Sequence, residues 1–309
     1  MGRLSPYINI ARPDHWFKNV FMLPGVVLAV LMSPETLVDH WLEIVLGFVS
    51  LCLLASANYT INEWLDARYD RHHPVKKDRP SATGEVSLRG VLAQYVALLC
   101  IGLGLAWSLH LAFFGTAVLF LTMGVIYNVP PIRSKDVPYL DVLSEAINNP
   151  LRLVMGWGTI ESELLPPSSI LLSYWMGGAF LMGIKRLGEY RFIDDPQRAA
   201  LYRKSFGRYN DQSLLLSSFF YALCASFFLA IFLIKYRIEF LLSFPLFAAL
   251  FTWYLALGLK DNSPAQNPEK LFQERGFMLF VVFLVAAVVA LFVIDIPGLR
   301  ILLTRLDYT

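Results

Sequence analysis

The chain has 309 residues, of which 56% are hydrophobic and only 16% are charged. Together with a mean hydropathy of +0.54, this composition excludes an ordinary soluble domain and predicts an integral membrane protein. The formal net charge is only +2, so we expect no nucleic-acid partner. Three cysteines, Cys52, Cys100 and Cys224, are widely spaced within apolar runs, which argues against a disulfide framework.

Nine apolar runs are long enough to cross the bilayer as helices, since about 20 residues span roughly 30 Å of hydrocarbon. They cover residues 16–32, 41–61, 88–110, 112–127, 137–160, 170–187, 214–234, 238–259 and 277–294. The first and fourth runs are short. The predicted fold is therefore all-α, with about nine transmembrane helices in a single bundle. No low-complexity linker divides residues 1–309, so we expect one domain.

The connections between these runs differ sharply in charge. The long segments 62–89 and 185–211 are rich in Lys and Arg and contain prolines. Segments on the opposite side hold only four basic residues, which are Lys235, Arg237, Arg300 and Arg305. The positive-inside rule places the N-terminus and the basic segments in the cytoplasm. We expect a multi-pass protein of a cell membrane, such as a bacterial inner membrane, whose active-site cavity faces the cytoplasm.

An acidic face follows the second apolar run, where Asn62, Asp66 and Asp70 lie four residues apart. Side chains at i and i+4 are neighbours on a helix, so three oxygen-bearing groups would share one face. Mg²⁺ prefers such ligands and takes the rest of its coordination from water and substrate phosphates. The spacing predicts a magnesium site with Asn62, Asp66 and Asp70 as ligands.

Basic residues come directly after this face. Arg71, Lys76, Lys77 and Arg79 supply the cations that a phosphate group needs. The alternative is that the whole stretch is a solvated, charged end of a membrane helix with no ligand.

A second polar segment begins with Lys185, Arg186 and Glu189 at the cytoplasmic end of the sixth run. These residues are candidates for substrate contacts, although basic residues also anchor a span, and an i,i+4 pair stabilises a helix by only about 0.2–0.5 kcal/mol. Further along, Asp194 and Asp195 precede Pro196. This pattern favours the start of a helix over a second metal site.

Arg152 lies within the fifth run, where inserting a charge costs about 2.5–3.5 kcal/mol and the charge usually faces a cavity or a partner. It follows two asparagines and a proline. We expect it to line the same interior as Asn62, with Asp141 or Glu145 as its counter-ion. Pairing without any ligand is the alternative.

Two further segments contribute candidate substrate-binding residues. After the fourth run, prolines impose a non-helical turn that carries Arg133 and Lys135, and Tyr127 lies just before that turn. Lys18 lies at the start of the first run, next to Trp16, which is placed to anchor the membrane interface.

The acidic face with its basic loop resembles the first motif of the UbiA superfamily of membrane prenyltransferases, N-D-x-x-D-x-x-x-D. The matching positions are Asn62, Asp66 and Asp70, with Glu63 in place of the usual aspartate. The following H-P-x-K-x-x-R-P-x-A-x-G looks more like one branch, the decaprenyl-phosphate phosphoribosyltransferases. R-P-D-H-W-F-K-N-V, G-I-K-R-x-x-E and P-E-K-L-F-Q-E-R also resemble that branch. The similarity covers most of the chain between residues 12 and 275.

This resemblance implies a transferase that joins a polyprenyl phosphate to C1 of phosphoribosyl pyrophosphate and releases pyrophosphate. Asp66 and Asp70, assisted by Asn62, would hold the Mg²⁺ of the pyrophosphate. Phosphate groups would bind to Lys76, Arg79, Lys185 and Arg186. Arg152 would steer the lipid phosphate. The sequence gives no indication of the oligomeric state.

Two alternatives remain at this stage. In an aromatic prenyltransferase the bound pyrophosphate would belong to a polyprenyl donor, and the acceptor would resemble 4-hydroxybenzoate. Such enzymes carry a second Asp-rich motif, whereas the corresponding segment here reads K-R-L-G-E. The other alternative is a lipid or solute transporter that uses the same charged cavity.

Overall fold

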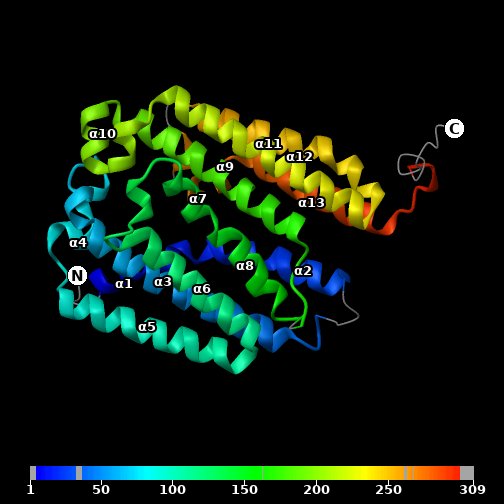
Figure 1. Ribbon diagram of the computed structural model, residues 1–309, viewed down its shortest axis with the longest axis horizontal. Coiled ribbons are helices and arrows are strands. Elements are labelled where there is room, and N and C mark those ends of the chain that lie inside the picture. Colours follow the sequence, from blue (N-terminus) through cyan, green and yellow to red (C-terminus); the bar gives the residue numbers. More distant parts are fainter. Residues whose placement is uncertain (1–4, 33–36, 162, 261–262, 267, 300–309) are drawn as a thin grey trace. The chain divides into compact units, whose positions relative to one another are not determined.

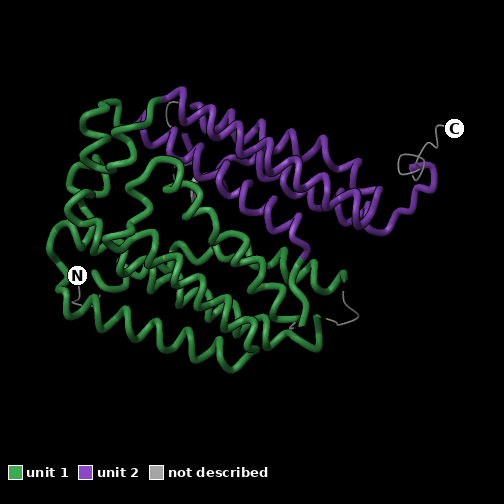
Figure 2. Tube along the Cα trace, in the orientation of Figure 1, with its two compact units in different colours: residues 1–166, 193–210 green, residues 167–192, 211–309 purple. Residues whose placement is uncertain are grey.

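The computed structural model, shown in Figure 1, describes residues 5–32, 37–161, 163–260, 263–266 and 268–299. All regular elements among these residues are helices, which confirms the predicted all-α class. The helices form two compact units, coloured separately in Figure 2: unit 1 comprises residues 1–166 and 193–210, and unit 2 comprises 167–192 and 211–309. The single domain and single bundle stay predictions. Arg300 and Arg305 lie outside the described residues.

Unit 1 contains eight α-helices before residue 166 and one after it. In chain order its elements are α1 (Ser5–Ala11), the 3₁₀ helix η1 (Pro13–Met22), α2 (Leu23–Met32), α3 (Trp41–Asp70), η2 (Lys76–Asp78), α4 (Pro80–Thr83), α5 (Leu88–Leu109), α6 (Leu111–Asn128), η3 (Ser134–Asp136), α7 (Leu140–Ala146), α8 (Asn148–Trp157), α10 (Pro196–Tyr202) and η4 (Lys204–Arg208).

The core of unit 1 lies among α3, α5, α6 and α8. Leu51 and Leu54 of α3 pack in one buried cluster with Phe113 and Phe120 of α6 and Met155 of α8. Small residues allow two helices to approach closely, because the neighbouring helix then occupies the space that a larger side chain would fill. This packing holds α3 rigidly along its apolar length and leaves its polar C-terminal turns to form the site.

Helices α2 and α8 cross at a pair of glycines. A Cβ atom added to Gly25 would lie 2.0 Å from the carbonyl oxygen of Leu153, and one added to Gly156 would lie 2.0 Å from that of Met22. No side chain fits at either position, since real Cβ contacts are much longer. Backbone contact at this crossing therefore requires glycine on both helices.

Unit 2 contains the long helices α9 (Ser168–Ile193), α11 (Asp211–Tyr236), α12 (Phe244–Gly258) and α13 (Arg275–Val293), with the 3₁₀ helices η5 (Ile238–Ser243), η6 (Pro264–Gln266) and η7 (Pro268–Gln273). The Arg191 guanidinium near the end of α9 donates two hydrogen bonds, of 2.5 and 2.8 Å, to the carboxylate of Asp211 at the start of α11. Large apolar side chains such as Phe227 and Leu279 are 62% and 70% exposed, as expected of helices that face lipid.

Seven helical segments of the described chain are long and apolar enough to cross a membrane. They are Ser5–Met32, Trp41–Asp70, Leu88–Leu109, Leu111–Asn128, Asp211–Tyr236, Ile238–Gly258 and Arg275–Val293. Each contains or closely matches one of the nine predicted runs. The membrane-protein prediction is therefore confirmed by seven segments, and a total of nine spans stays a prediction.

The other two predicted runs differ from expectation. Residues 137–160 do not form one long helix but α7 and α8, which are interrupted at Ile147. Pro150 explains the interruption, because it has no N–H to donate to the carbonyl group of Ala146 and its ring clashes with that carbonyl. The run 170–187 lies within α9, which is long enough to cross a membrane but is less apolar than the seven segments above.

Candidate functional site

The predicted acidic face lies at the C-terminal end of α3. Asn62, Asp66 and Asp70 all belong to this helix, and Asp70 is its last residue. Carboxylates are unfavourable at this end because the helix dipole is negative there, by about 0.3–1 kcal/mol each. Cations from other segments of unit 1 offset this repulsion, and they are the residues that build the site.

Asp66 is held by the turn that follows α6. Its Oδ1 atom accepts a hydrogen bond of 2.8 Å from Nη2 of Arg133 and lies 2.6 Å from Nζ of Lys135. The Arg133 backbone is in the left-handed region, with φ 32°, a conformation that is uncommon for a residue with a Cβ. Three contacts of its guanidinium hold this conformation: Asp66, the carbonyl oxygen of Asn128 at 2.8 Å and Asp136 at 3.3 Å.

Lys135 is almost fully buried and connects two helices. Besides Asp66, its ammonium group donates to Oδ1 of Asn62 and to Oδ1 of Asn128, both at 2.8 Å. Burial lowers the pKa of Lys135 to about 8, although the neighbouring Asp66 carboxylate acts in the opposite direction. The ammonium group is therefore mainly charged at pH 7, and its three partners hold it between α3 and α6.

Asp70 is paired with the basic loop after α3. Its Oδ2 atom accepts a 2.6 Å hydrogen bond from Arg79, the residue that precedes α4. Gly84 ends α4 in the left-handed conformation, with φ 82°, where a Cβ would be strained. Lys76 donates from the same loop to the hydroxyl group of Tyr202 on α10. The predicted residues Lys76 and Arg79 are thus both placed beside the acidic face.

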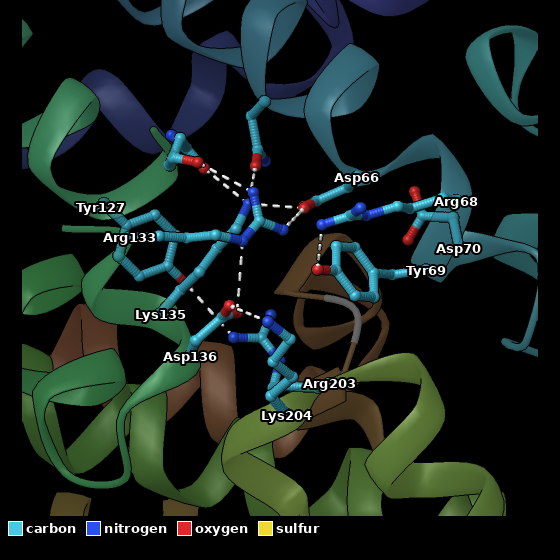
Figure 3. Close-up of polar contacts among 12 residues, drawn as sticks. Asp66, Arg68, Tyr69, Asp70, Tyr127, Arg133, Lys135, Asp136, Arg203 and Lys204 are labelled. Carbon is cyan, nitrogen blue, oxygen red and sulfur yellow. Dashed lines mark hydrogen bonds and ion pairs between the residues drawn. The ribbon is translucent and has the colours of Figure 1, made fainter. Parts of the chain in front are cut away.

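Part of this network lines a cavity that we call the first cavity, and Figure 3 shows the polar contacts among its labelled side chains. Its lining residues are Asp66, Tyr69, Asp70, Arg133, Lys135, Asp136, Tyr202, Arg203 and Lys204. Its empty space, counted together with the part that is open to solvent, is about 290 Å³. Four basic residues exceed three acidic ones in this lining, so an anion is the favoured occupant.

The last three lining residues come from the segment α10–η4. Lys204 lies 3.2 Å from Asp136, and this hydrogen bond raises the pKa of Lys204. Arg203 donates to the hydroxyl group of Tyr127 at 3.4 Å. Their place in the cavity makes Arg203 and Lys204 candidates for phosphate binding.

The donor set of the first cavity fits Mg²⁺ bound mainly by its ligand. Among the described residues no group of three or more His, Cys, Asp or Glu side chains is arranged to hold a metal on its own. Asp66 and Asp70 line the same cavity, and two carboxylates suffice when phosphate oxygens and water complete the coordination. The third predicted ligand, Asn62, already accepts a hydrogen bond from Lys135.

A second cavity adjoins this network and contains Arg152, as predicted, together with Asn62 and Tyr127. Arg152 donates to Asn19 of η1 at 3.1 Å and to Asn149 at 3.4 Å. Of the two expected counter-ions, Glu145 lines this cavity with Arg152, whereas Asp141 does not. Its carboxylate instead accepts hydrogen bonds from Ser205 and Tyr209, because the segment after α10 folds over α7.

Two residues near the motif lie apart from both cavities. Glu63, which replaces an aspartate of the resembled motif, is buried 3.6 Å from Arg12 and accepts from the backbone of Ser81 at 3.5 Å. It therefore ties α3 to the N-terminal segment and α4. Lys18 lies on η1 with its Nζ atom 3.1 Å from Nδ1 of His15 and lines neither cavity. Its substrate contact stays a prediction.

The predicted residues of the second polar segment belong to α9 in unit 2. Arg186 and Glu189 are buried there and form an ion pair of 3.3 Å, one helical turn apart. Lys185 lies on the same helix. Their contribution to a substrate site stays a prediction. Asp195 is the N-cap of α10, since its side chain accepts from the backbone N–H groups of Gln197 and Arg198, which confirms the expected helix start.

Several site residues were not assigned from the sequence. Tyr69, Asp136 and Tyr202 line the first cavity, and Asn58 and Asn128 line the second. One signal for Asn58 was present, because it lies four residues before Asn62 and so extends the same helical face. The tyrosines gave no signal, since aromatic residues are common throughout this chain.

The fold and the site define a helical membrane protein in which carboxylates and cations converge on a pocket suited to phosphates. Residues 21–284 match the model of the UbiA prenyltransferase family, and the chain belongs to that family. The predicted resemblance is thereby confirmed, and so is the prediction of an integral-membrane transferase at the level of the family.

Individual relatives are more distant. The chain is 28% identical over 202 residues to the nodulation protein NoeC of Azorhizobium caulinodans, covering 65% of this chain and 62% of that protein. It is 29% identical over 213 residues to the decaprenyl-phosphate phosphoribosyltransferase of Mycolicibacterium smegmatis, covering 68% and 64%. The chain therefore spans less than two thirds of the length of these curated relatives.

The fold is also that of a solved structure, a UbiA homolog from Archaeoglobus fulgidus bound to GPP and Mg²⁺. The two share 23% identity with a TM-score of 0.69, over 94% of this chain and all of the other. At this identity the comparison shows the fold.

Proposed function

We propose that the protein is a Mg²⁺-dependent membrane transferase that moves 5-phosphoribose from phosphoribosyl pyrophosphate to a polyprenyl phosphate of the decaprenyl type. The observation that carries this proposal is the first cavity, where Asp66 and Asp70 lie among a surplus of cations. The similarity to the phosphoribosyltransferase of M. smegmatis supports the choice of substrates, and the Mg²⁺ bound to the homolog from A. fulgidus supports the choice of metal.

The reaction requires no side-chain nucleophile. An oxygen atom of the lipid phosphate, already anionic at neutral pH, attacks C1 of the donor. The bond from C1 to the pyrophosphate oxygen breaks, and its electron pair leaves with pyrophosphate. The protein has to position two anions against each other and to stabilise the charge on the leaving group.

The residues of unit 1 divide this work. Asp66 and Asp70, with Asn62 nearby, would hold Mg²⁺, which supplies positive charge to the departing pyrophosphate. Lys76, Arg79, Arg133 and Lys135 bind the phosphate oxygens. Lys185, Arg186 and Glu189 belong to α9 of unit 2, and their contact with substrate stays a prediction from the sequence. The active site faces the cytoplasm, where the water-soluble donor is available, and the lipid tail stays in the bilayer.

A donor assay tests the proposal directly. Purified protein in lipid nanodiscs with Mg²⁺ is given labelled phosphoribosyl pyrophosphate and polyprenyl phosphate, and in parallel a polyprenyl pyrophosphate and 4-hydroxybenzoate. We expect labelled phosphoribosyl lipid from the first pair. A prenylated aromatic product from the second pair alone would contradict the proposal and favour aromatic prenyl transfer. The GPP bound to the structural relative is the reason for including this second pair.

Asparagine substitutions test the two carboxylates. Asp70→Asn is expected to lower Mg²⁺-dependent turnover by about 100-fold or more, as for other groups that stabilise transition-state charge. Asp66→Asn should do the same and also lower the thermal unfolding temperature, because it leaves the buried Arg133 and Lys135 without their anion. Asp78→Asn, an exposed carboxylate in the loop after α3, is the matched control. Full activity in both site variants would refute the metal assignment.

A further inference from the structure

The second cavity is polar although it lies among apolar helices. It has about 430 Å³ of empty space between α3, α6 and the α7–α8 pair. Four asparagines, Asn58, Asn62, Asn128 and Asn148, line it together with Glu145 and Arg152. Such a lining is unfavourable in a membrane bundle unless each polar group has a partner.

Several of these groups have no partner within the described chain. The Asn58 amide makes no hydrogen bond there, and the Glu145 carboxylate forms neither a hydrogen bond nor an ion pair. Oδ1 of Asn148 is buried and likewise unpaired, although the Asn148 amide nitrogen donates to the backbone carbonyl group of Glu145 at 3.0 Å. Unpaired polar atoms of this kind point to a ligand that supplies hydrogen bonds.

The chemistry of the lining selects the ligand. Amides and a carboxylate match hydroxyl groups, which both donate and accept, whereas an isoprenyl chain offers neither. Arg152 adds a cation, and an arginine fork matches a phosphate. Lys135 joins this cavity to the first one, because its single ammonium group contacts Asp66, Asn62 and Asn128. The first cavity therefore offers cations and two carboxylates of α3, and the second offers amides, a carboxylate and the cation of Arg152.

We propose that the second cavity binds the ribose 5-phosphate part of the donor, with its hydroxyl groups at Asn58, Glu145 and Asn148 and its 5-phosphate at Arg152. This inference rests on the proposed function, and it assigns Arg152 to the donor rather than to the lipid phosphate. Pyrophosphate then occupies the first cavity, and C1 lies where the two cavities meet.

Fragment inhibition and steady-state kinetics test the assignment in protein reconstituted in nanodiscs. Glu145→Gln and Arg152→Met are compared with Glu163→Gln and Arg89→Met, which change exposed residues of the same type. We expect each cavity variant to raise the KM for phosphoribosyl pyrophosphate and the inhibition constant of ribose 5-phosphate about tenfold or more. The KM for polyprenyl phosphate and the inhibition by pyrophosphate stay unchanged, as do all constants of the control variants.

A second fragment isolates the hydroxyl contacts. 2-Deoxyribose 5-phosphate should inhibit the wild type more weakly than ribose 5-phosphate, and Glu145→Gln should reduce that difference. The variant Arg152→Lys keeps a cation at this position, and its unfolding temperature is measured as well. Together these show whether weaker binding is caused by loss of the phosphate contact or by loss of the fold. A folded Lys variant that recovers part of the affinity supports the assignment.

The outcomes separate this inference from the proposed function. If the cavity variants raise the KM for the lipid and leave ribose 5-phosphate inhibition unchanged, the inference is wrong while phosphoribosyl transfer stands. If no phosphoribosyl transfer occurs, direct binding of labelled ribose 5-phosphate to the wild type still tests the cavity. Binding that is weakened in Arg152→Met and not in Arg89→Met supports the inference; absence of binding to the wild type overturns it.

Discussion

Single residues in the first cavity are oriented before any ligand binds. Asp66 uses one oxygen atom for both Arg133 and Lys135, and Asp70 uses one for Arg79. Two buried cations on one carboxylate oxygen leave positive charge that a phosphate can neutralise. Because the partners are already fixed by hydrogen bonds, little reorganisation is needed when the anion arrives.

Replacement of Arg133 by lysine tests this preorganisation. The Arg133 guanidinium contacts Asp66, Asp136 and the carbonyl of Asn128 at once, and a single ammonium group cannot reach all three. Arg133→Lys is expected to reduce the free energy of unfolding by about 1–3 kcal/mol and to raise the KM of the donor. Thermal unfolding and donor titration measure both. Arg89→Lys at an exposed site should change neither quantity. If Arg133→Lys has the stability and the donor KM of the wild type, Arg133 does not have this preorganising role.

Substitution of Asp195 distinguishes a helix cap from a second metal site. The structure shows its carboxylate capping α10, and α10–η4 carries Tyr202 and Arg203 to the first cavity. Asn also caps well, so Asp195→Asn should keep the stability and the Mg²⁺ dependence of the wild type, whereas Asp195→Ala should cost about 1 kcal/mol. Titration of activity with Mg²⁺ checks this. A markedly weaker Mg²⁺ response in Asp195→Asn would indicate a metal ligand instead.

At the scale of elements, the crossing of α2 and α8 fixes the position of Arg152. Gly156 lies one helical turn after that residue, and its missing side chain lets α8 touch the backbone of Met22. Asn19, which accepts from Arg152, lies on the adjoining η1. The contact at Gly156 therefore places Arg152 of α8 against the Asn19 amide of η1.

An alanine at this crossing should destabilise the protein. The Cβ atom of Gly156→Ala would meet a carbonyl oxygen at 2.0 Å, and overpacking of this kind costs about 1–3 kcal/mol. Gly115→Ala is the matched helical control, since no atom lies within 4 Å of its added Cβ; alanine there should be neutral or slightly stabilising. Unfolding temperatures in detergent measure the difference. Equal temperatures for the two variants would show that the crossing relaxes freely.

How far the sequence predicts these elements depends on the range of the interactions. Asn62, Asp66 and Asp70 were placed on one helical face because i,i+4 spacing is a local property. The interruption at Ile147 was missed, although Pro150 and the two asparagines before it signalled it. The partners of Asp66 and Asp141 come from segments more than 60 residues away, and no local pattern in the sequence specifies such pairs.

At the scale of the whole molecule, the distribution of charge and the exposed apolar surface both fit a protein that spans a membrane. Exposed apolar side chains on α11 and α13 suit contact with lipid, while the basic residues gather in connections predicted to lie in the cytoplasm. Both seven and nine are odd numbers of crossings, so either count leaves the N-terminus inside and the C-terminus outside. Sidedness of the termini therefore does not distinguish the two counts.

The short connection between α8 and α9 does distinguish them. With nine crossings Glu163 lies outside, whereas with seven it shares the cytoplasmic side with Lys77. Both residues are exposed, as is Val38, which lies outside in either case. Single-cysteine variants Glu163→Cys, Lys77→Cys and Val38→Cys, made after replacing the three native cysteines by alanine, are treated with a membrane-impermeant maleimide in intact cells. We expect labelling at positions 38 and 163, and at position 77 only after permeabilisation. If position 163 behaves like position 77, then α7–α8 and α9 do not cross the membrane.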